Sequence, residues 1–292
     1  MEKIKSPLSR KATLVAVAIS QWTGRKLDKR ITDEVNSSHG ASADAGRYNK
    51  LLLEKKRLAK INSVVSQARE LHYRLTKPWA DQGGLRILPN KLHKQFTDEF
   101  RKLKRDFEDA VDEFCVDYPA AIEERKRALN GLFNEADYPS PKDIRSKFSL
   151  DTTTSSVPDK DDFRSEGLDE ATIEDIKREL ETSSAKILDA AMLDSFEQMK
   201  KVVGHMAEKL KAYKTDGGGF FTDSLVGNVR ELVELLPSFN LTDDPAFDAL
   251  TAKIARELCA EEPKTLRDND ELRADVAKSA DDILKEIDGL LG

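Results

Sequence analysis

The fold is decided by the stretch Phe96-Thr-Asp-Glu-Phe-Arg-Lys-Leu-Lys-Arg-Asp-Phe-Glu-Asp-Ala-Val-Asp-Glu-Phe114. Its apolar residues recur at alternating steps of four and three, which is the pattern of a helix packed lengthwise against a second helix. We expect this helix to cover about 90–117. A second helical pattern covers about 47–76 and ends before Pro78, because the residue before a proline resists the α region. The two helices predict an antiparallel, coiled-coil-like hairpin roughly 40 Å long.

Further helices are expected on the C-terminal side of this hairpin. Pro119 is tolerated best in the first turn of a helix, so it predicts a separate helix over about 119–134. The longest pattern covers 169–213, with the hydroxyls of 182–184 as the one place where it could kink, and the glycines 217–219 end it. Three shorter helices are expected near 222–236, 245–261 and 268–290, separated by prolines at 237 and 263.

Two segments have the alternation and β-branched residues of strands, 14–22 and 144–154, and a returning strand could begin at Phe163-Arg164. The polar residues 32–46 predict a loop with at most one helical turn. The predicted class is therefore mostly α with a small β-sheet (α+β), in which the helical hairpin packs with a two- or three-stranded sheet. We expect a basic N-terminal region, 1–168, and an acidic helical region, 169–292, within one continuous elongated domain.

Composition excludes several classes of protein. The 292 residues are 35% charged and 39% hydrophobic, with 14 Gly and 10 Pro, which is typical of a helix-rich chain. Two cysteines, Cys115 and Cys259, leave neither a disulfide framework nor a Cys-based zinc site, and the four histidines lack metal-ligand spacing. No apolar run reaches the roughly 20 residues of a membrane span, and no cleavage site follows the apolar stretch 12–19. A cytosolic location is expected.

Charge is distributed unevenly along the chain. Residues 1–110 contain 24 Lys and Arg against 13 Asp and Glu, whereas the remaining 182 residues contain 24 against 41. A basic part joined to an acidic part is typical of a protein whose basic part meets a polyanion. The same pattern also fits internal or intersubunit complementarity, and the sequence leaves both open.

The basic surface carries the candidate site. Cations supply attraction to phosphates, and a flat aromatic ring can stack on an unpaired base. For the tryptophans, a role as core anchors is the favoured interpretation, and the cations could equally form a solvated face. The candidate nucleic-acid-binding residues are Arg25, Lys26, Lys55, Lys56, Arg57, Trp79, Arg86, Arg101, Lys102, Lys104 and Arg105.

The sequence offers little for catalysis. The glycines 217–219 lack the Lys-Ser/Thr of a phosphate loop and follow a helix, and no nucleophile motif surrounds either cysteine. His72 and His205 lie on or beside apolar seams, which favours buried core histidines. Asp159, Asp161 and Asp162 could hold Mg²⁺ or Ca²⁺, but a solvated turn is the favoured interpretation. We therefore expect no catalytic residue, no metal site and no cofactor, with a metal-dependent enzyme as the weakest alternative.

Several short motifs resemble one family: Trp22-Thr-Gly-Arg-Lys26, Pro78-Trp79 with Arg86-Ile-Leu-Pro89, Tyr138-Pro139, and Val157-Pro158 with Asp162-Phe-Arg164. Over roughly 14–260 the chain resembles an uncharacterised family of bacteriophage, prophage and plasmid proteins, catalogued as a domain of unknown function. The resemblance implies a mobile-element protein made in the bacterial cytoplasm. It brings no activity and no catalytic residues to this chain.

Two functions follow as hypotheses. In the first, a non-enzymatic protein binds nucleic acid, with single-stranded DNA among its candidate ligands, and forms a homo-oligomer through its long helices. In the second, the chain is a protein–protein interaction module without nucleic-acid binding, whose partner is a host defence protein or a phage-encoded ATPase.

Overall fold

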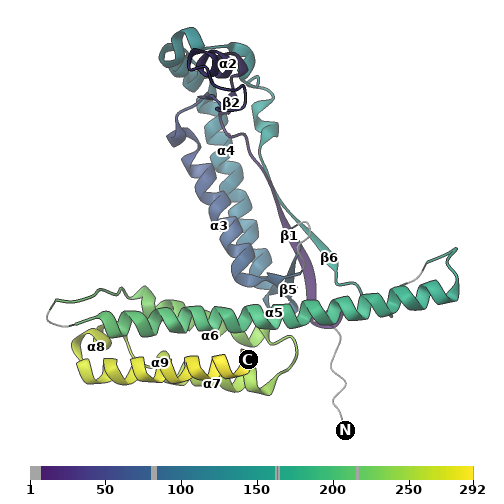
Figure 1. Cartoon of the computed structure of the whole chain (residues 1–292), viewed down its shortest axis with the longest axis vertical. Coiled ribbons are helices and arrows are strands. Elements are labelled where there is room, and N and C mark those ends of the chain that lie inside the picture. Colours follow the sequence, from purple (N-terminus) through teal and green to yellow (C-terminus); the bar gives the residue numbers. More distant parts are fainter. Residues whose placement is uncertain (1–7, 80–83, 162, 164, 215–216, 292) are drawn as a thin grey trace. The chain divides into compact units, whose positions relative to one another are not determined.

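The computed structural model describes residues 8–79, 84–161, 163, 165–214 and 217–291 (Figure 1). The chain divides into two compact units. Unit 1 comprises 1–16, 75–94 and 154–292, and unit 2 comprises 17–74 and 95–153. The units interleave along the chain, so neither coincides with the continuous regions 1–168 and 169–292. The mostly α fold with a small β component is confirmed.

Unit 2 contains the predicted antiparallel hairpin of helices α3 (Ala59–Leu75) and α4 (His93–Leu129), which lie side by side in Figure 1. The apolar residues of the deciding stretch form its buried seam, and Phe107 is 1% exposed. Ion pairs join the helices along their length, among them Lys60–Glu113 at 2.5 Å and Arg74–Glu99 at 2.6 Å. Residues early in α3 thus meet residues late in α4, as an antiparallel pair requires.

Helix α4 continues through Pro119, so the separate helix expected from 119 is wrong. An interior proline costs about 3 kcal/mol, because it removes one hydrogen bond and crowds the preceding turn. The apolar seam continues on both sides of it: Phe114, Tyr118 and Ala121 are buried, and the Tyr118 hydroxyl donates to the Pro139 carbonyl at 3.0 Å. Burial of large side chains contributes about 1.5–3 kcal/mol each, which outweighs the cost of the proline.

The helix expected over 47–76 begins late, at Ala59. Before it come β3 (Asn49–Leu51) and a 3₁₀ helix, η1 (Lys55–Leu58). Strand β3 pairs antiparallel with β2 (Arg25–Leu27) in a two-stranded ribbon. The expected loop also contains a ten-residue helix, α2 (Lys29–Ser38), because the Asp28 carboxylate caps it by accepting from the Ile31 backbone N–H.

The second sheet has four strands in the order β4-β5-β1-β6, one more than the sequence analysis allowed. Strands β1 (Ala12–Ser20) and β6 (Ser149–Ser156) were expected, although η5 (Ile144–Lys147) occupies the start of the predicted 144–154 strand. Strands β4 (Lys77–Pro78) and β5 (Arg86–Pro89) were not expected, and β5 pairs antiparallel with both β1 and β4. Phe163 lies outside any strand, and Arg164 lies outside the described residues.

Unit 1 is built on the longest helix, α5 (Glu170–Ala212), which continues past Thr182 although that hydroxyl bonds back to the Arg178 carbonyl at 2.8 Å. Helices α6 (Ser224–Phe239) and α9 (Asp270–Leu291) pack along α5, and Met199, Val203 and Met206 lie fully buried in their shared core.

The other helices of the unit are α1 (Leu8–Lys11), α7 (Pro245–Leu258) and α8 (Pro263–Asp268). Single 3₁₀ turns occur at η2 (Asn90–Leu92) in unit 1 and at η3 (Asn130–Leu132) and η4 (Glu135–Asp137) in unit 2. Within the described residues, no helix has the length and apolarity needed to cross a membrane.

Candidate functional site

The predicted nucleic-acid-binding residues are divided between the two units. Nine belong to unit 2, whereas Trp79 and Arg86 belong to unit 1. Trp79 is half-buried against the hydrophobic core of unit 1. Arg86 donates from Nε to the Thr76 hydroxyl at 2.7 Å and from Nη2 to the Thr76 carbonyl at 3.2 Å. Both side chains therefore contribute to the packing of unit 1.

Four of the nine candidates in unit 2 are paired with carboxylates of the same unit. The pairs are Lys26–Asp137 at 2.9 Å, Lys56–Glu54 at 2.6 Å, Arg57–Glu124 at 2.6 Å and Lys104–Asp151 at 2.6 Å. The hydrogen bond from Arg57 lowers the pKa of Glu124, so this carboxylate stays charged opposite its cation. Unit 2 as a whole holds 22 Lys and Arg against 20 Asp and Glu. Within unit 2, the residues after position 110 hold 6 Lys and Arg against 9 Asp and Glu, which reduces the net charge of the unit from +5 to +2.

The other five candidates are exposed and have no ion-pair partner among the described residues: Arg25, Lys55, Arg101, Lys102 and Arg105. Three of them lie within four residues of one another on α4, and Arg25 lies on β2. These are the only candidates in the described part of unit 2 whose charge is not already matched within the fold.

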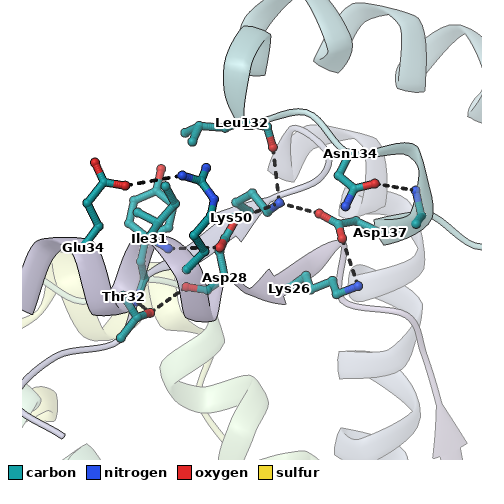
Figure 2. A network of polar contacts seen from close by, with 12 residues as sticks. Lys26, Asp28, Ile31, Thr32, Glu34, Lys50, Leu132, Asn134 and Asp137 are labelled. Atoms are coloured by element: carbon teal, nitrogen blue, oxygen red, sulfur yellow. Dashed lines mark hydrogen bonds and ion pairs between the residues drawn. The ribbon is translucent and has the colours of Figure 1, made fainter. Parts of the chain in front are cut away.

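A buried cation that the sequence analysis missed organises the end of unit 2 that carries the ribbon (Figure 2). The Lys50 side chain is 6% exposed, and its Nζ lies 2.9 Å from Asp28, 2.5 Å from Asp137 and 3.2 Å from the Leu132 carbonyl. Burial alone would lower the pKa of Lys50, but the bonds to Asp137 and Asp28 outweigh it and raise the pKa. Lys26 binds the other oxygen of Asp137.

The two faces of the β2–β3 ribbon differ because side chains alternate along a strand. Lys26 and Lys50 are cross-strand partners, and both bind Asp137 on the inner face. The opposite face carries Arg25 paired with Leu51 and Leu27 paired with Asn49, and we call these four residues the ribbon face. Leu27 is 38% exposed and Leu51 39% exposed.

Hydrogen bonds to the backbone fix the position of the ribbon face. The Leu52 backbone N–H donates to the Gly24 carbonyl at 2.7 Å, and Arg125 donates from Nη2 to the Leu51 carbonyl at 2.7 Å. The backbone that carries the two exposed leucines is already ordered. Little backbone conformational entropy is therefore lost when a partner covers these side chains. The sequence signal for this face is weak, because strands of three residues are too short to display a period.

The candidate metal residues lie in unit 1. Asp159 accepts hydrogen bonds from the Ser9 hydroxyl and from the Asp161 backbone N–H, which lower its pKa. Asp162 lies outside the described residues. Among the residues that the structure does describe, no three His, Cys, Asp or Glu side chains converge as metal ligands would.

The two cysteines and one lysine are removed from solvent to different degrees: Cys115 lies in unit 2, whereas Cys259 and Lys77 lie in unit 1. Cys115 and Cys259 are half-buried, and burial raises the pKa of each thiol, which disfavours the reactive thiolate. Lys77 is fully buried, and its Nζ contacts Asp194 at 3.0 Å, Gln198 at 2.9 Å and the Phe239 ring at 4.2 Å. Burial lowers the pKa of Lys77 to about 8. These three contacts assign the Lys77 side chain to the packing of unit 1.

Comparisons of the chain with protein-family models, with curated proteins and with solved structures find no match. The resemblance to the phage and plasmid family stays a prediction. The surfaces of the two units are therefore the features that bear on function.

Proposed function

We propose that this chain is a non-enzymatic protein-interaction module that binds a protein partner through the ribbon face. The observation that carries the proposal is the pair of exposed leucines, Leu27 and Leu51, on one side of a rigid two-stranded ribbon. The two leucines are diagonal neighbours across the ribbon, a relation that places residues roughly 7–8 Å apart, so one apolar surface can cover both. Exposed apolar patches with a polar border are typical of protein-binding surfaces.

The charge pattern also favours a protein partner. A nucleic-acid surface needs several unpaired cations on one face, because each neutralised phosphate adds a salt-sensitive contribution to binding. Lys26, Lys56 and Arg57 already have carboxylate partners within unit 2. The cation that remains on the ribbon face, Arg25, is of the type enriched in protein interfaces.

A photo-crosslinking amino acid at position 27 tests the proposal. We expect irradiation in the host cytoplasm to give one discrete crosslinked polypeptide. The matched control carries the same group at Val116, which is 81% exposed on α4 in the same unit, and should give none. Equal crosslinking at both positions, or none at position 27, would refute the proposal.

Nucleic-acid binding remains a second candidate because Arg101, Lys102 and Arg105 are exposed, close together and unpaired among the described residues. Three phosphate contacts would give a logarithmic salt dependence with a slope of about −2 to −3. Replacing all three by Gln should abolish that slope in a filter-binding assay with single- and double-stranded DNA and RNA. The control replaces Lys126 and Arg127, exposed cations near the other end of α4. An absence of binding at about 50 mM salt eliminates this candidate.

A further inference from the structure

Unit 1 has an open groove of about 520 Å³ where three of its elements meet. Helix α5, the turn before α7 and the end of α9 form it, and we call it the end groove. Its floor is apolar, with Met192 and Phe196 less than 10% exposed, while Leu193 and Leu290 at its edge are 47% and 45% exposed. These leucines are more exposed than those of the ribbon face. The lining residues are Asp189, Met192, Leu193, Phe196, Thr242, Asp243, Asp244, Pro245, Leu290 and Leu291.

The border of the end groove is acidic. Asp243 pairs with Lys11 at 2.5 Å, and Asp244 caps α7 by accepting from the Ala246 backbone N–H at 2.9 Å. Asp189 is exposed and has no ion-pair partner among the described residues. Unit 1 carries 34 Asp and Glu against 26 Lys and Arg, so its field adds to the negative potential of this border.

The ribbon face has the complementary character. It presents two leucines with Arg25 beside them, and the exposed cations Lys29, Arg47 and Lys55 lie on the segments next to the ribbon. We propose that the ribbon face of one copy binds in the end groove of a second copy of this chain, with Leu27 and Leu51 on the apolar floor and Arg25 at the acidic border. This inference rests on the proposed function and names the partner of that face.

The two surfaces belong to different units, so the contact is heterologous. A heterologous contact uses one surface from each copy and leaves the other surface of each copy available, so copies add head to tail. Association should therefore continue beyond two copies as the protein concentration rises. Opposite charges at the border make the association weaker at high ionic strength.

Sedimentation velocity over a range of concentrations tests the inference on the full chain. The wild type should form a concentration-dependent series of oligomers. A ribbon variant, Leu27→Asp with Leu51→Asp, and a groove variant, Leu193→Lys with Leu290→Lys, should each be monomeric alone. An equimolar mixture of the two should form a dimer that does not grow, because each variant retains one intact surface. Val116→Asp, on an exposed position of α4, should associate like the wild type.

A charge exchange separates loss of the contact from loss of folding. Arg25→Glu should weaken association with a wild-type groove at least tenfold, and a copy carrying Asp189→Arg should restore it. A wild type that stays monomeric at every concentration, or variants that fail to complement in the mixture, would overturn the inference. In either case a crosslink from position 27 to a different polypeptide would leave the proposed function standing, whereas no crosslink at all would refute both.

Discussion

The ammonium group of Lys77 lies fully inside unit 1, so the stability of this unit should depend on pH in the alkaline range. Burial lowers the pKa of Lys77 from 10.5 to about 8, while the pair with Asp194 opposes the shift and the charge of Arg86 adds to it. Between these pH values the unfolded chain holds a proton that the folded chain has released. The free energy of unfolding therefore rises with pH across that window.

The size of this effect follows from the shift. One pKa unit corresponds to about 1.36 kcal/mol. The contribution of Lys77 to the free energy of unfolding should therefore rise by about 2.5 kcal/mol between pH 7 and pH 10. Replacing Lys77 by Met removes the titrating group and keeps a side chain of similar length. Relative to this variant, the wild-type protein should gain about 2.5 kcal/mol of unfolding free energy between pH 7 and pH 10.

The two tryptophans make the measurement specific to each unit, because Trp22 lies in unit 2 and Trp79 in unit 1. In a Trp22→Phe background, Trp79 fluorescence reports urea unfolding of unit 1 two residues from the substitution. All other ionisations are common to both proteins and cancel in the difference. A difference that stays constant from pH 7 to pH 10 would refute the reasoning, since Lys77 would then titrate as in water.

Three further substitutions test individual elements by urea or thermal denaturation. Lys50→Met should lower the unfolding free energy of unit 2 by about 3 kcal/mol, because the nearly buried Asp137 then keeps Lys26 as its single ion-pair partner. An unchanged unfolding free energy would contradict a stabilising role for the ion pairs of Lys50. Pro119→Ala should stabilise unit 2 by about 1 kcal/mol or more, since it restores a helical N–H, and a loss would show that the ring contributes packing. Gly219→Ala should destabilise unit 1 by about 2 kcal/mol or more, because φ at this position is +71° and an added Cβ would collide with the Ala212 carbonyl oxygen. The control, Gly227→Ala, adds a Cβ in open space and should be neutral or stabilising.

The long helices could be predicted because their signal is local. The steps of four and three from Phe96 to Phe114 identify a buried seam, and the structure buries that seam against α3. Helix α5 was placed to within a residue at either end, because Asp169 caps its start and the apolar pattern stops before the glycines. Such patterns depend on residues three or four apart, which a single sequence displays directly.

Two of the differences depend on partners that lie far away in the sequence. Strand β5 is four residues long, and it becomes a strand by pairing with Ala12–Val15, more than seventy residues earlier. Pro119 was interpreted as a boundary because its local cost is visible, whereas the burial of Tyr118 that offsets it requires the folded hairpin.

The candidate site shows the same limit. Counting charge by position assigned a basic surface to 1–110. Two carboxylates beyond that boundary, Glu113 and Glu124, pair with Lys60 on α3 and with Arg57 on η1. The basic count was correct, but four of the nine candidate cations in unit 2 are paired with carboxylates of the same unit. The exposed leucines of the ribbon face had no periodic signal, since β2 and β3 have three residues each.

The binding of one copy's ribbon to another copy's groove can be tested most directly with engineered cysteines. One chain carries Leu27→Cys and the other Leu193→Cys, both in a Cys115→Ser, Cys259→Ser background, and the two are oxidised together and separately. The account predicts a disulfide-linked pair in the mixture and little linkage in either chain alone. Equal linkage in all three samples, or linkage only between two copies of the same variant, would contradict it.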